Sequence, residues 1–459
     1  MTINPQVFRA YDIRGKAGSD LTEEVYRLLG RAFGSTLREL YAIDRPRVAV
    51  GRDMRLHSPA FQRATVEGLI LAGCDVLDIG ETPSPVNYFM ICDRKLDGGL
   101  QVTASHNPKE DNGLKLQIRD AVAFAGEDIQ KLRLRIETGD FLEGKGSVQS
   151  LDALSAYLAW LEKGFLRTGK DMNVAIDAGN GMAGPAAMEI LKRIGAKATG
   201  LFTIPDGTFP NHSADPSKLE TLRELQALVV ASKADIGFAF DGDVDRLGVI
   251  DERGAIRTCD EVLLLLAQDY LKRFPGTPVV FTVSMSSTLD TEIRKWGGKP
   301  EMCEVGHSFV EHVMHKTGSM LGGEQSGHFF LGDVSYGYDD ALIVALQILT
   351  ILRKASKPLS ALCADFPKVF LAPERRPACP DDKKVDVVRR VIEHFSTSYP
   401  VNTIDGARID FSDGAWASIR FSNTSPRLSI CIEARSQDTL RTVEDIVLSH
   451  LHTYPEIAW

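Results

Sequence analysis

The residues of this chain that are best suited to chemistry lie in short polar loops, each of which follows an apolar segment. In the clearest of them, Asp241, Asp243 and Asp245 alternate directly after the apolar run Ile236–Phe240. Carboxylates at every second position can point toward one hard cation, and magnesium and calcium both favour oxygen ligands. Because three bunched carboxylates repel one another unless a cation neutralises them, this loop predicts a divalent-metal site.

Other interpretations of the aspartate loop stay open at this point, the plainest being a solvated acidic turn. A calcium loop of the EF-hand type would have Glu252 at its twelfth position, but Arg246 occupies the sixth, where a glycine is needed. The flanking segments also have the pattern of strands rather than helices. A phosphatase would likewise place two aspartates after an apolar strand, with Asp241 as the nucleophile.

The segment Thr103–Pro108 is the second candidate loop. Ser105 follows a predicted strand, where a serine can act as a nucleophile or carry a phosphoryl group, although a lone serine can equally form a turn or a helix cap. His106 is next to it and would point elsewhere on an extended chain, and the chain has no G-x-S-x-G elbow, so a hydrolase triad is not predicted. Lys115 is expected either to supply a nearby cation or proton or to lie in solvent.

In the third loop, Glu324, Ser326 and His328 alternate among glycines. A carboxylate, a hydroxyl and an imidazole on one face suit hydrogen bonding to the vicinal hydroxyls of a sugar, whereas a glycine-rich turn is the simpler alternative. His307 is expected to join this site or to lie on the surface.

The fourth loop, Arg420–Arg427, joins two predicted strands near the C-terminus. The planar guanidinium of Arg420 suits phosphate, and Ser422, Asn423 and Thr424 add side-chain and backbone donors. The loop therefore predicts a phosphate site, with an ordinary hairpin turn as the alternative.

Three similar α/β units are expected to position the first three loops. Short β-branched segments alternate with helical patterns, which predicts a mainly parallel or mixed sheet in each unit. Since ligands bind beyond the carboxyl ends of strands in such sheets, the loops are expected to converge on one cleft. The repeated segments are Arg47–Val50, Cys74–Ile79 and Gly99–Val102, then Asn173–Ile176, Lys197–Phe202 and Ile236–Phe240, and then Pro278–Val283, Pro300–Val305 and Ser319–Leu321.

A small α+β domain with an antiparallel sheet is expected at the C-terminus. Phe370–Asp382 contains three prolines and many charges, which is typical of a linker. A helical pattern follows it, with Val385, Val388, Ile392 and Phe395 on one face. The predicted domains are 1–150 with the serine loop, 151–255 with the aspartate loop, 256–368 with the sugar-binding loop and 369–459 with the phosphate loop.

The composition excludes several classes of protein. The 459 residues carry a formal net charge of −9, which does not suit nucleic-acid binding. No secretory signal is visible, and the strongest apolar run, Val262–Ala267, is too short to span a bilayer. Seven scattered cysteines form no CxxC pair, so neither a disulfide framework nor a zinc site is indicated. We expect a cytoplasmic protein, a monomer or weak dimer, that binds neither nucleic acid nor membrane.

Taken together, the motifs resemble those of the α-D-phosphohexomutases over essentially the whole chain. Each motif alone is weak, but the ordered set is specific. The first and last motifs are most similar to the bacterial phosphomannomutase/phosphoglucomutase branch, whereas the third loop has a form common among phosphoglucosamine mutases. The segments are FRAYDIRG (Phe8–Gly15), TASHNP (Thr103–Pro108), DGDVDR (Asp241–Arg246), GEQSGH (Gly323–His328) and RFSNTSP (Arg420–Pro426).

The resemblance implies three similar α/β domains with mixed sheets and a C-terminal α+β domain of the TATA-binding-protein-like type around a central cleft. It implies an isomerase that moves a phosphoryl group between O1 and O6 of mannose or glucose phosphates, through an enzyme phosphoserine and a hexose 1,6-bisphosphate. A phosphoglucosamine mutase, a metal-dependent phosphatase with an aspartate nucleophile and a non-catalytic sugar-phosphate sensor stay as alternatives.

The resemblance also assigns roles to the loop residues. Ser105 would be phosphorylated, and Mg²⁺ would be held by its phosphate with Asp241, Asp243 and Asp245. Many relatives carry a basic residue facing the substrate where this chain has Ser284, a departure that weakens one expected contact. The catalytic residues would be Ser105, Lys115, Arg246 and Arg14, and the substrate-binding residues Tyr11, Asn107, His307, Glu324, Ser326, His328, Arg420, Ser422, Asn423 and Thr424.

Overall fold

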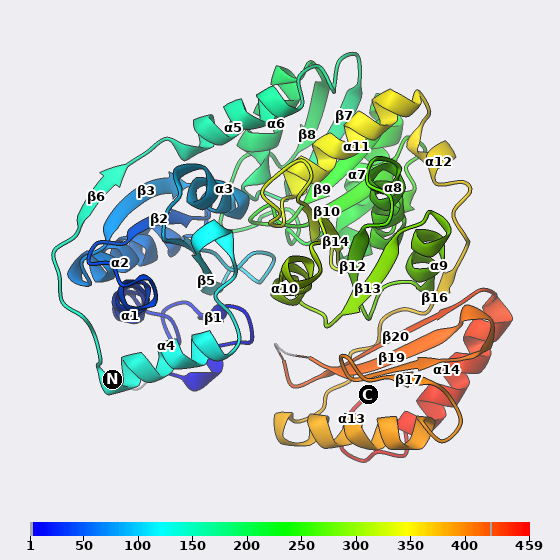
Figure 1. The fold of residues 1–459 in the computed structure, drawn as a ribbon. Helices are drawn as coiled ribbons and strands as arrows, with labels where there is room; N and C mark the ends of the chain where they lie inside the picture. The colour runs from blue at the N-terminus through cyan, green and yellow to red at the C-terminus, as the bar shows by residue number, and fades with distance from the viewer. Residues whose placement is uncertain (1–2, 423–424) are drawn as a thin grey trace. The chain divides into compact units, whose positions relative to one another are not determined.

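The computed structural model of the protein describes residues 3–422 and 425–459. The chain divides into two compact units. Unit 1 consists of Met1–Cys259 and Ser326–Cys363, and unit 2 consists of Asp260–Gln325 and Ala364–Trp459. Figure 1 shows the helices and strands of both units in chain order.

A six-stranded mixed sheet forms the N-terminal part of unit 1. Its strands are β1 (Ile13–Lys16), β2 (Arg47–Arg52), β3 (Asp75–Glu81), β4 (Gly98–Val102), β5 (Asp111–Ile118) and β6 (Ser147–Ser150). They lie in the order β1-β5-β4-β2-β3-β6. β2, β3, β4 and β6 are parallel, whereas β5 runs antiparallel to β4 and to β1.

Four helices cover this first sheet: α1 (Glu23–Tyr41), α2 (Ser58–Leu71), α3 (Ser84–Arg94) and α4 (Glu127–Thr138). α1 begins after Thr22, whose side chain caps the backbone N–H of Val25. α1, α2 and α4 share one hydrophobic core with the strands, while α3 packs on β2 and β4. Every residue of β4 is buried, so the loop that follows it leaves a strand covered on both faces.

A second, five-stranded sheet completes the main part of unit 1. Its strands are β7 (Asn173–Asp177), β8 (Lys197–Leu201), β9 (Ile236–Phe240), β10 (Leu247–Asp251) and β11 (Ile256–Arg257), in the order β11-β10-β9-β7-β8. The helices of this part are α5 (Ala153–Gly164), α6 (Ala183–Arg193), α7 (Arg223–Ser232), α11 (Ala341–Ala355) and α12 (Leu359–Leu362), and a short strand, β15 (Phe329–Leu331), precedes α11. β9 and β10 are antiparallel neighbours, so the aspartate loop between them is a tight connection.

Unit 2 contains a parallel sheet and an antiparallel sheet. The parallel strands β12 (Pro278–Thr282), β13 (Lys299–Cys303) and β14 (Leu321–Gly323) lie in the order β13-β12-β14, with α8 (Cys259–Arg273), α9 (Ser287–Lys295) and α10 (His307–Thr317) between them in the chain. The antiparallel strands are β16 (Phe370–Leu371), β17 (Val401–Asn402), β18 (Ala407–Asp410), β19 (Trp416–Phe421) and β20 (Leu428–Ala434), in the order β16-β20-β19-β18-β17. α13 (Asp381–Phe395) and α14 (Gln437–Leu451) pack with that sheet in one core. The expected fold class is confirmed: the chain has three α/β parts with parallel or mixed sheets and a C-terminal α+β part.

Two details of the C-terminal prediction are wrong. The segment predicted as a linker is paired with the last sheet, because Phe370–Leu371 lies antiparallel to β20 and Arg375 bridges to Ile430. In α13, Val385 is 59% exposed, and the buried face instead carries Val387, Val388, Val391 and Phe395. Both sets of residues recur at helical spacing and share Val388 and Phe395, so the spacing alone does not decide between Val385 and Val387.

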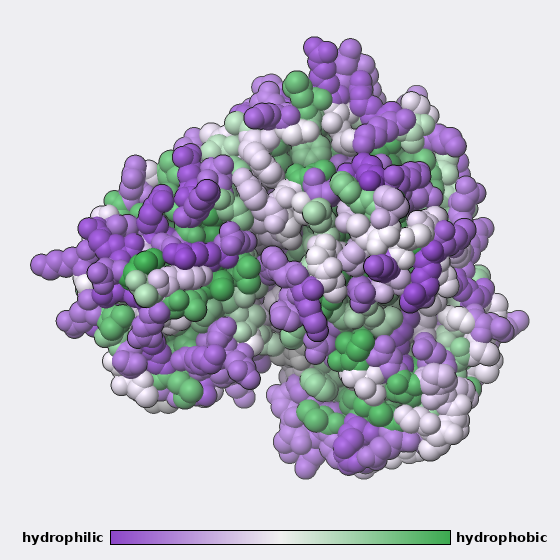
Figure 2. Space-filling view, in the orientation of Figure 1, coloured by the Kyte–Doolittle hydropathy of each residue, from purple (hydrophilic) through white to green (hydrophobic). Residues whose placement is uncertain are grey.

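Hydrophilic residues cover most of the surface visible in Figure 2, with hydrophobic residues in small patches between them. Within residues 3–422 and 425–459, none of the helices has the length and apolar character needed to cross a membrane.

Candidate active site

Ser105 lies just beyond the carboxyl end of β4, in a sharply turned loop. Its φ is +48°, a left-handed conformation that a serine adopts only where the surroundings enforce it. The Oγ atom donates a hydrogen bond to Oδ2 of Asp241 at 2.5 Å and lies 3.1 Å from Nδ1 of His106. The expectation that His106 points away was therefore wrong, because the chain at Ser105 is not extended.

The aspartate loop between β9 and β10 is almost completely shielded from solvent. Oδ1 of Asp241 accepts hydrogen bonds from the backbone N–H groups of Val244, at 2.9 Å, and Asp245, at 3.1 Å. Val244 has a φ of +73°, which is strained for a β-branched residue. This backbone geometry turns the carboxylates of Asp241, Asp243 and Asp245 toward one another.

Lys115 of β5 balances part of this negative charge. Its Nζ lies 2.7 Å from Oδ2 of Asp243 and also forms an ion pair with Asp245. Burial opposes the charge on Lys115, but Asp243 and Asp245 outweigh it and raise the pKa of the ammonium. Lys115 is thus a buried cation at the centre of the site rather than a solvated strand residue.

The three aspartates fit a divalent cation. Each offers an oxygen, and these oxygens lie within 4.8 Å of one another. Among the described residues, neither Oδ1 of Asp243 nor Oδ1 of Asp245 has a hydrogen-bond partner, although both atoms are buried. Burial, together with repulsion from Asp245 and Asp243, raises the pKa of Asp241 well above its usual range. A hard cation bound by oxygen ligands would remove both the unmet hydrogen-bonding capacity and the repulsion.

Ser84 is a member of the site that sequence reasoning missed. Its hydroxyl donates a hydrogen bond to Oδ2 of Asp243, and its backbone N–H donates to the carbonyl oxygen of the same aspartate at 2.9 Å. Ser84 is the first residue of α3, so a helix of the first sheet fixes an aspartate of the second. The two residues are 159 positions apart.

Arg14 is a second cation in unit 1, and its side chain is partly buried. Its Nε donates to Oδ2 of Asp12 at 2.6 Å, and its Nη1 donates to the carbonyl oxygen of Thr103 at 2.9 Å. Burial opposes its charge, but Asp12 and Asp243 raise the pKa of the guanidinium above its usual value. Asp12 orients Arg14 through this hydrogen bond. It lies in the FRAYDIRG segment, but the sequence did not predict it as a site residue.

Two side chains in series, those of His328 and Asp339, hold Arg246. Its Nε donates to Nε2 of His328 at 3.0 Å, and Nδ1 of His328 lies 2.7 Å from Oδ2 of Asp339. An Nε2 atom that accepts requires the imidazole proton on Nδ1, which faces Asp339. Asp339 was also missed, because nothing in its local sequence marks it as a partner of His328.

In unit 2, Arg420 is held by Asp405. Oδ2 of Asp405 accepts from Nε of Arg420 at 2.9 Å and from the backbone N–H of Val305 at 3.0 Å. Lys384 of α13, a cation that was not predicted, donates to the carbonyl oxygen of Ser422 at 2.8 Å. Of the other predicted phosphate ligands, Asn423 and Thr424 lie outside the described residues.

The remaining predicted residues divide between the two units. Tyr11, Asn107 and Ser326 belong to unit 1, and each is partly exposed; Asn107 donates to Oδ2 of Asp111 at 3.1 Å. Glu324 and His307 belong to unit 2, where Glu324 is buried directly after β14 and His307 opens α10. Ser284 is buried in the turn after β12, with its Oγ 3.3 Å from Oγ1 of Thr282.

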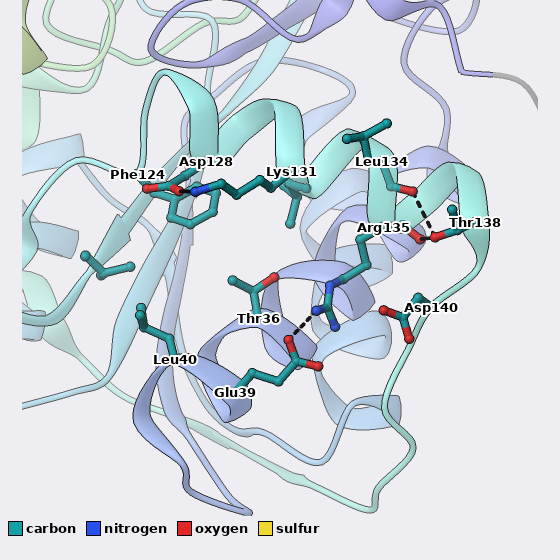
Figure 3. Close-up of a pocket in the computed structure, with 12 residues that line it drawn as sticks. Thr36, Glu39, Leu40, Phe124, Asp128, Lys131, Leu134, Arg135, Thr138 and Asp140 are labelled. Atoms are coloured by element: carbon teal, nitrogen blue, oxygen red, sulfur yellow. Dashed lines mark hydrogen bonds and ion pairs between the residues drawn. The ribbon is translucent and has the colours of Figure 1, made fainter.

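A cavity of about 660 Å³ opens at a different place in unit 1. It lies between α1 and α4 and contains none of the predicted site residues, as the close-up in Figure 3 illustrates. Glu39 and Arg135 form an ion pair across it, and Leu40 and Leu134 are about half exposed at its rim. Lys131 and Asp128 form a second ion pair in its lining.

The structure therefore gathers Ser105, Lys115, Arg14, Arg246, His328 and the three aspartates in unit 1. A buried hydroxyl stands beside a carboxylate cluster that fits a metal, with three cationic side chains around it. This arrangement suits the acceptance and release of a phosphoryl group, whose transfer depends mainly on positioning and charge.

Family models of four consecutive domains match nearly the whole chain. They are the phosphoglucomutase/phosphomannomutase alpha/beta/alpha domain I at residues 5–143, domain II at 155–254, domain III at 258–370 and the C-terminal domain at 375–450.

Individual proteins match over similar lengths. A phosphomannomutase/phosphoglucomutase of Pseudomonas aeruginosa is 37% identical over 451 residues, which are 98% of this chain and 96% of that protein. A phosphoglucomutase of Neisseria gonorrhoeae is 36% identical over 466 residues, covering 100% of this chain and 99% of that protein. The crystal structure of a phosphoglucomutase/phosphomannomutase family protein from Burkholderia thailandensis superposes with a TM-score of 0.89 at 38% identity, covering 97% of this chain and 96% of that one.

Proposed function

Because the chain belongs to the phosphoglucomutase/phosphomannomutase family, we propose that it interconverts the 1- and 6-phosphates of mannose and of glucose through a phosphorylated Ser105. The chain is a hexose-phosphate mutase, an isomerase that moves a phosphoryl group within its substrate. The serine that carries the group, the metal and the preferred sugars are parts of this proposal.

The observation that carries the proposal is the hydrogen bond from Ser105 to Asp241. It places a hydroxyl at the edge of the carboxylate cluster, where a phosphate on Oγ would add oxygens to those of the aspartates. In the proposed cycle, phosphorylated Ser105 donates its phosphoryl group to the free hydroxyl of a hexose phosphate. The hexose 1,6-bisphosphate then turns over and returns its other phosphoryl group to Ser105.

Mg²⁺ held by Asp241, Asp243, Asp245 and the Ser105 phosphate would supply positive charge that stabilises the transferring group. The chain itself adds three fixed cations. Lys115 is buried and Arg14 is partly buried, and neighbouring aspartates stabilise the charge of both side chains. Arg246 is aimed by His328. These side chains are positioned before substrate arrives, so little reorganisation is needed as charge shifts between oxygens.

The substrate-binding part of the proposal rests on unit 2. Arg420, fixed by Asp405, would hold the phosphate that is not reacting, with Ser422 beside it and Lys384 behind the loop. Glu324 and His307, which belong to the same unit, would bind the sugar. A grip on the distal phosphate and on paired hydroxyls serves both orientations of the bisphosphate.

The structure disfavours the phosphatase alternative. An aspartate nucleophile needs an oxygen free to attack, whereas Oδ1 of Asp241 accepts from backbone N–H groups and Oδ2 accepts from Ser105. The two functions differ in product. A phosphatase would release inorganic phosphate in step with free sugar, and a mutase would release little.

The preferred hexose can be tested directly. We would compare kcat/KM for mannose, glucose and glucosamine 1-phosphates with Mg²⁺ and catalytic amounts of the matching 1,6-bisphosphate, in the native chain and in Ser105→Ala. Comparable turnover of the mannose and glucose esters, lost in Ser105→Ala, is expected. Dominant turnover of the glucosamine ester would assign the chain to the phosphoglucosamine mutases instead.

A further inference from the structure

Arg55, in the turn between β2 and α2, donates to four backbone carbonyl oxygens in and just beyond the serine loop. Its Nη2 donates to Ser105 at 2.9 Å and to Asn107 at 2.6 Å. Its Nη1 donates to Pro108 at 2.6 Å and, just beyond the loop, to Asp111 at the start of β5 at 3.0 Å. One guanidinium therefore binds the whole turn that carries the reactive hydroxyl.

The serine loop depends on this cation for its shape. The four carbonyl oxygens converge on the guanidinium, and without its positive charge they would repel one another. Ser105 itself has the strained φ of +48°, which persists only where neighbouring groups over-determine it. Gly242 of the aspartate loop packs so closely that a Cβ there would lie 2.4 Å from the carbonyl oxygen of Ser105. The carbonyl oxygen of Ser105 therefore contacts both Arg55 and the aspartate loop.

Arg55 is completely buried, and the second sheet region closes over it. The ring centroid of Phe209 lies 5.1 Å from the guanidinium carbon, and Phe209 has a φ of +47°. A Cβ on Gly207 would lie 2.8 Å from the Cα of Arg55, so the segment that contains Gly207 and Phe209 packs directly on the turn that contains Arg55. Nε of Arg55 pairs with Oδ2 of Asp53 at 3.2 Å, which offsets the cost of burying the charge.

We propose that Arg55, covered by Phe209, is the positioning residue that holds the Ser105 loop in the conformation needed for phosphoryl transfer. The inference rests on the proposed function, because it assigns Ser105 the transferring hydroxyl. In the Ser105 loop, the hydrogen bonds of Arg55 go to backbone oxygens and not to the reacting hydroxyl. Its loss is therefore expected to misplace Ser105 without weakening the phosphate grip of unit 2.

The test compares Arg55→Lys with the native chain. A lysine keeps the charge but cannot bridge four carbonyls. A displacement of the hydroxyl by about 1 Å costs about 100-fold in rate. We expect kcat, and the single-turnover rate of Ser105 phosphorylation by glucose 1,6-bisphosphate, to fall by that factor while KM changes by less than about threefold. In Arg55→Ala, added methylguanidinium should restore part of the rate. An unchanged kcat in folded Arg55→Lys, or a KM that rises as kcat falls, would overturn the proposal.

A second pair of variants keeps the test decisive if Arg55 variants do not fold. Phe209→Leu leaves every hydrogen bond of Arg55 in place but removes the ring, and should lower kcat about 3- to 10-fold. Phe202→Leu is its matched control, since Phe202 lies in the same connection with a φ of +49° and its ring packs edge-to-face against His212 instead. Equal activities of the two leucine variants would contradict the role of Phe209 and Arg55.

Hydrogen exchange separates failure of this inference from failure of the proposed function. Amides of residues 103–112, including that of Asn107, which donates to the carbonyl oxygen of Ala104 at 2.9 Å, should exchange faster in Arg55→Lys and in Phe209→Leu, but not in Phe202→Leu. This readout needs no turnover. Unchanged exchange in both variants would refute the positioning role. Faster exchange in both variants, together with a native chain that never phosphorylates Ser105, would refute only the proposed function.

Discussion

The hydroxyl of Ser105 donates a 2.5 Å hydrogen bond to Oδ2 of Asp241, across 136 residues of sequence. Ser105 lies in the loop after β4 of the first sheet, and Asp241 directly follows β9 of the second sheet. The contact therefore joins the two sheets of unit 1 at the point where a phosphoryl group and a metal would meet.

Asp243→Asn should weaken metal binding more than it disturbs the fold. The amide keeps the volume but removes one of the negative charges that attract a divalent cation. We expect the Mg²⁺ concentration needed for half-maximal phosphorylation of Ser105 to rise at least about tenfold. The measurement is a Mg²⁺ titration, with Asp140→Asn, an exposed aspartate after α4, as the control. Equal Mg²⁺ requirements in the two variants would remove Asp243 from the metal site.

Asp405→Asn should weaken phosphate binding through Arg420. The carboxylate accepts from Nε of Arg420 and from the backbone of Val305, so its loss frees the guanidinium from its fixed orientation. We expect KM for the hexose phosphate, and the inhibition constant of inorganic phosphate, to rise about tenfold with a smaller change in kcat. Asp410→Asn, at an exposed position on β18, is the matched control. Unchanged KM in Asp405→Asn would show that Arg420 needs no such support.

Tyr157→Phe should destabilise unit 1 by about 1–3 kcal/mol, because it leaves a buried carboxylate short of a donor. The Tyr157 hydroxyl donates to Oδ2 of Asp340 at 2.6 Å, and burial raises the pKa of Asp340 to about 7. Tyr336→Phe lies in the same aromatic cluster but is 46% exposed, and should cost less than about 0.5 kcal/mol. Chemical unfolding curves compare the two; equal shifts would mean that the hydrogen bond contributes nothing.

Asp260 should make unit 2 less stable as pH rises. Burial raises the pKa of Asp260 to about 7, with repulsion from Glu433 added and attraction to Arg408 opposing it. Between about pH 4 and 7 the folded chain holds a proton that the unfolded carboxyl has released, so raising the pH through this window lowers the free energy of unfolding.

Ionisation of Asp260 lowers the free energy of unfolding by at most about 4 kcal/mol across this window. In the native chain, Oδ1 of Asp260 accepts a hydrogen bond from the backbone N–H of Ser286 at 2.7 Å. Asp260→Asn keeps an oxygen that can accept this hydrogen bond, but its side chain cannot ionise. Its stability relative to the native chain should therefore increase from pH 4 to pH 8. Parallel pH profiles for the two proteins would contradict this assignment.

Local sequence predicted those parts of the site that are contiguous in the chain. Asp241, Asp243 and Asp245 are visible because one loop supplies all three carboxylates, and Ser105 because a strand ends just before it. Arg55 and Ser84 act through contacts with residues 50 and 159 positions away, and no local spacing indicates such contacts.

The structure also corrected expectations that assumed regular backbone. His106 was expected to point away from Ser105, which holds for an extended chain but not for a residue at a φ of +48°. Phe370–Asp382 has the prolines and charges of a linker, yet its first residues pair with β20. Proline and charge are tolerated on an edge strand as well as in a linker, so composition cannot tell the two apart.

The most direct test of the account is the phosphorylation state of Ser105. The native chain and Ser105→Ala would each be incubated with glucose 1,6-bisphosphate and Mg²⁺, and intact-mass spectrometry followed by peptide mapping would count and locate covalent phosphoryl groups. The account predicts one phosphoryl group on Ser105 in the native chain and none in Ser105→Ala. A phosphoryl group on Asp241, or equal labelling and turnover in both proteins, would contradict it.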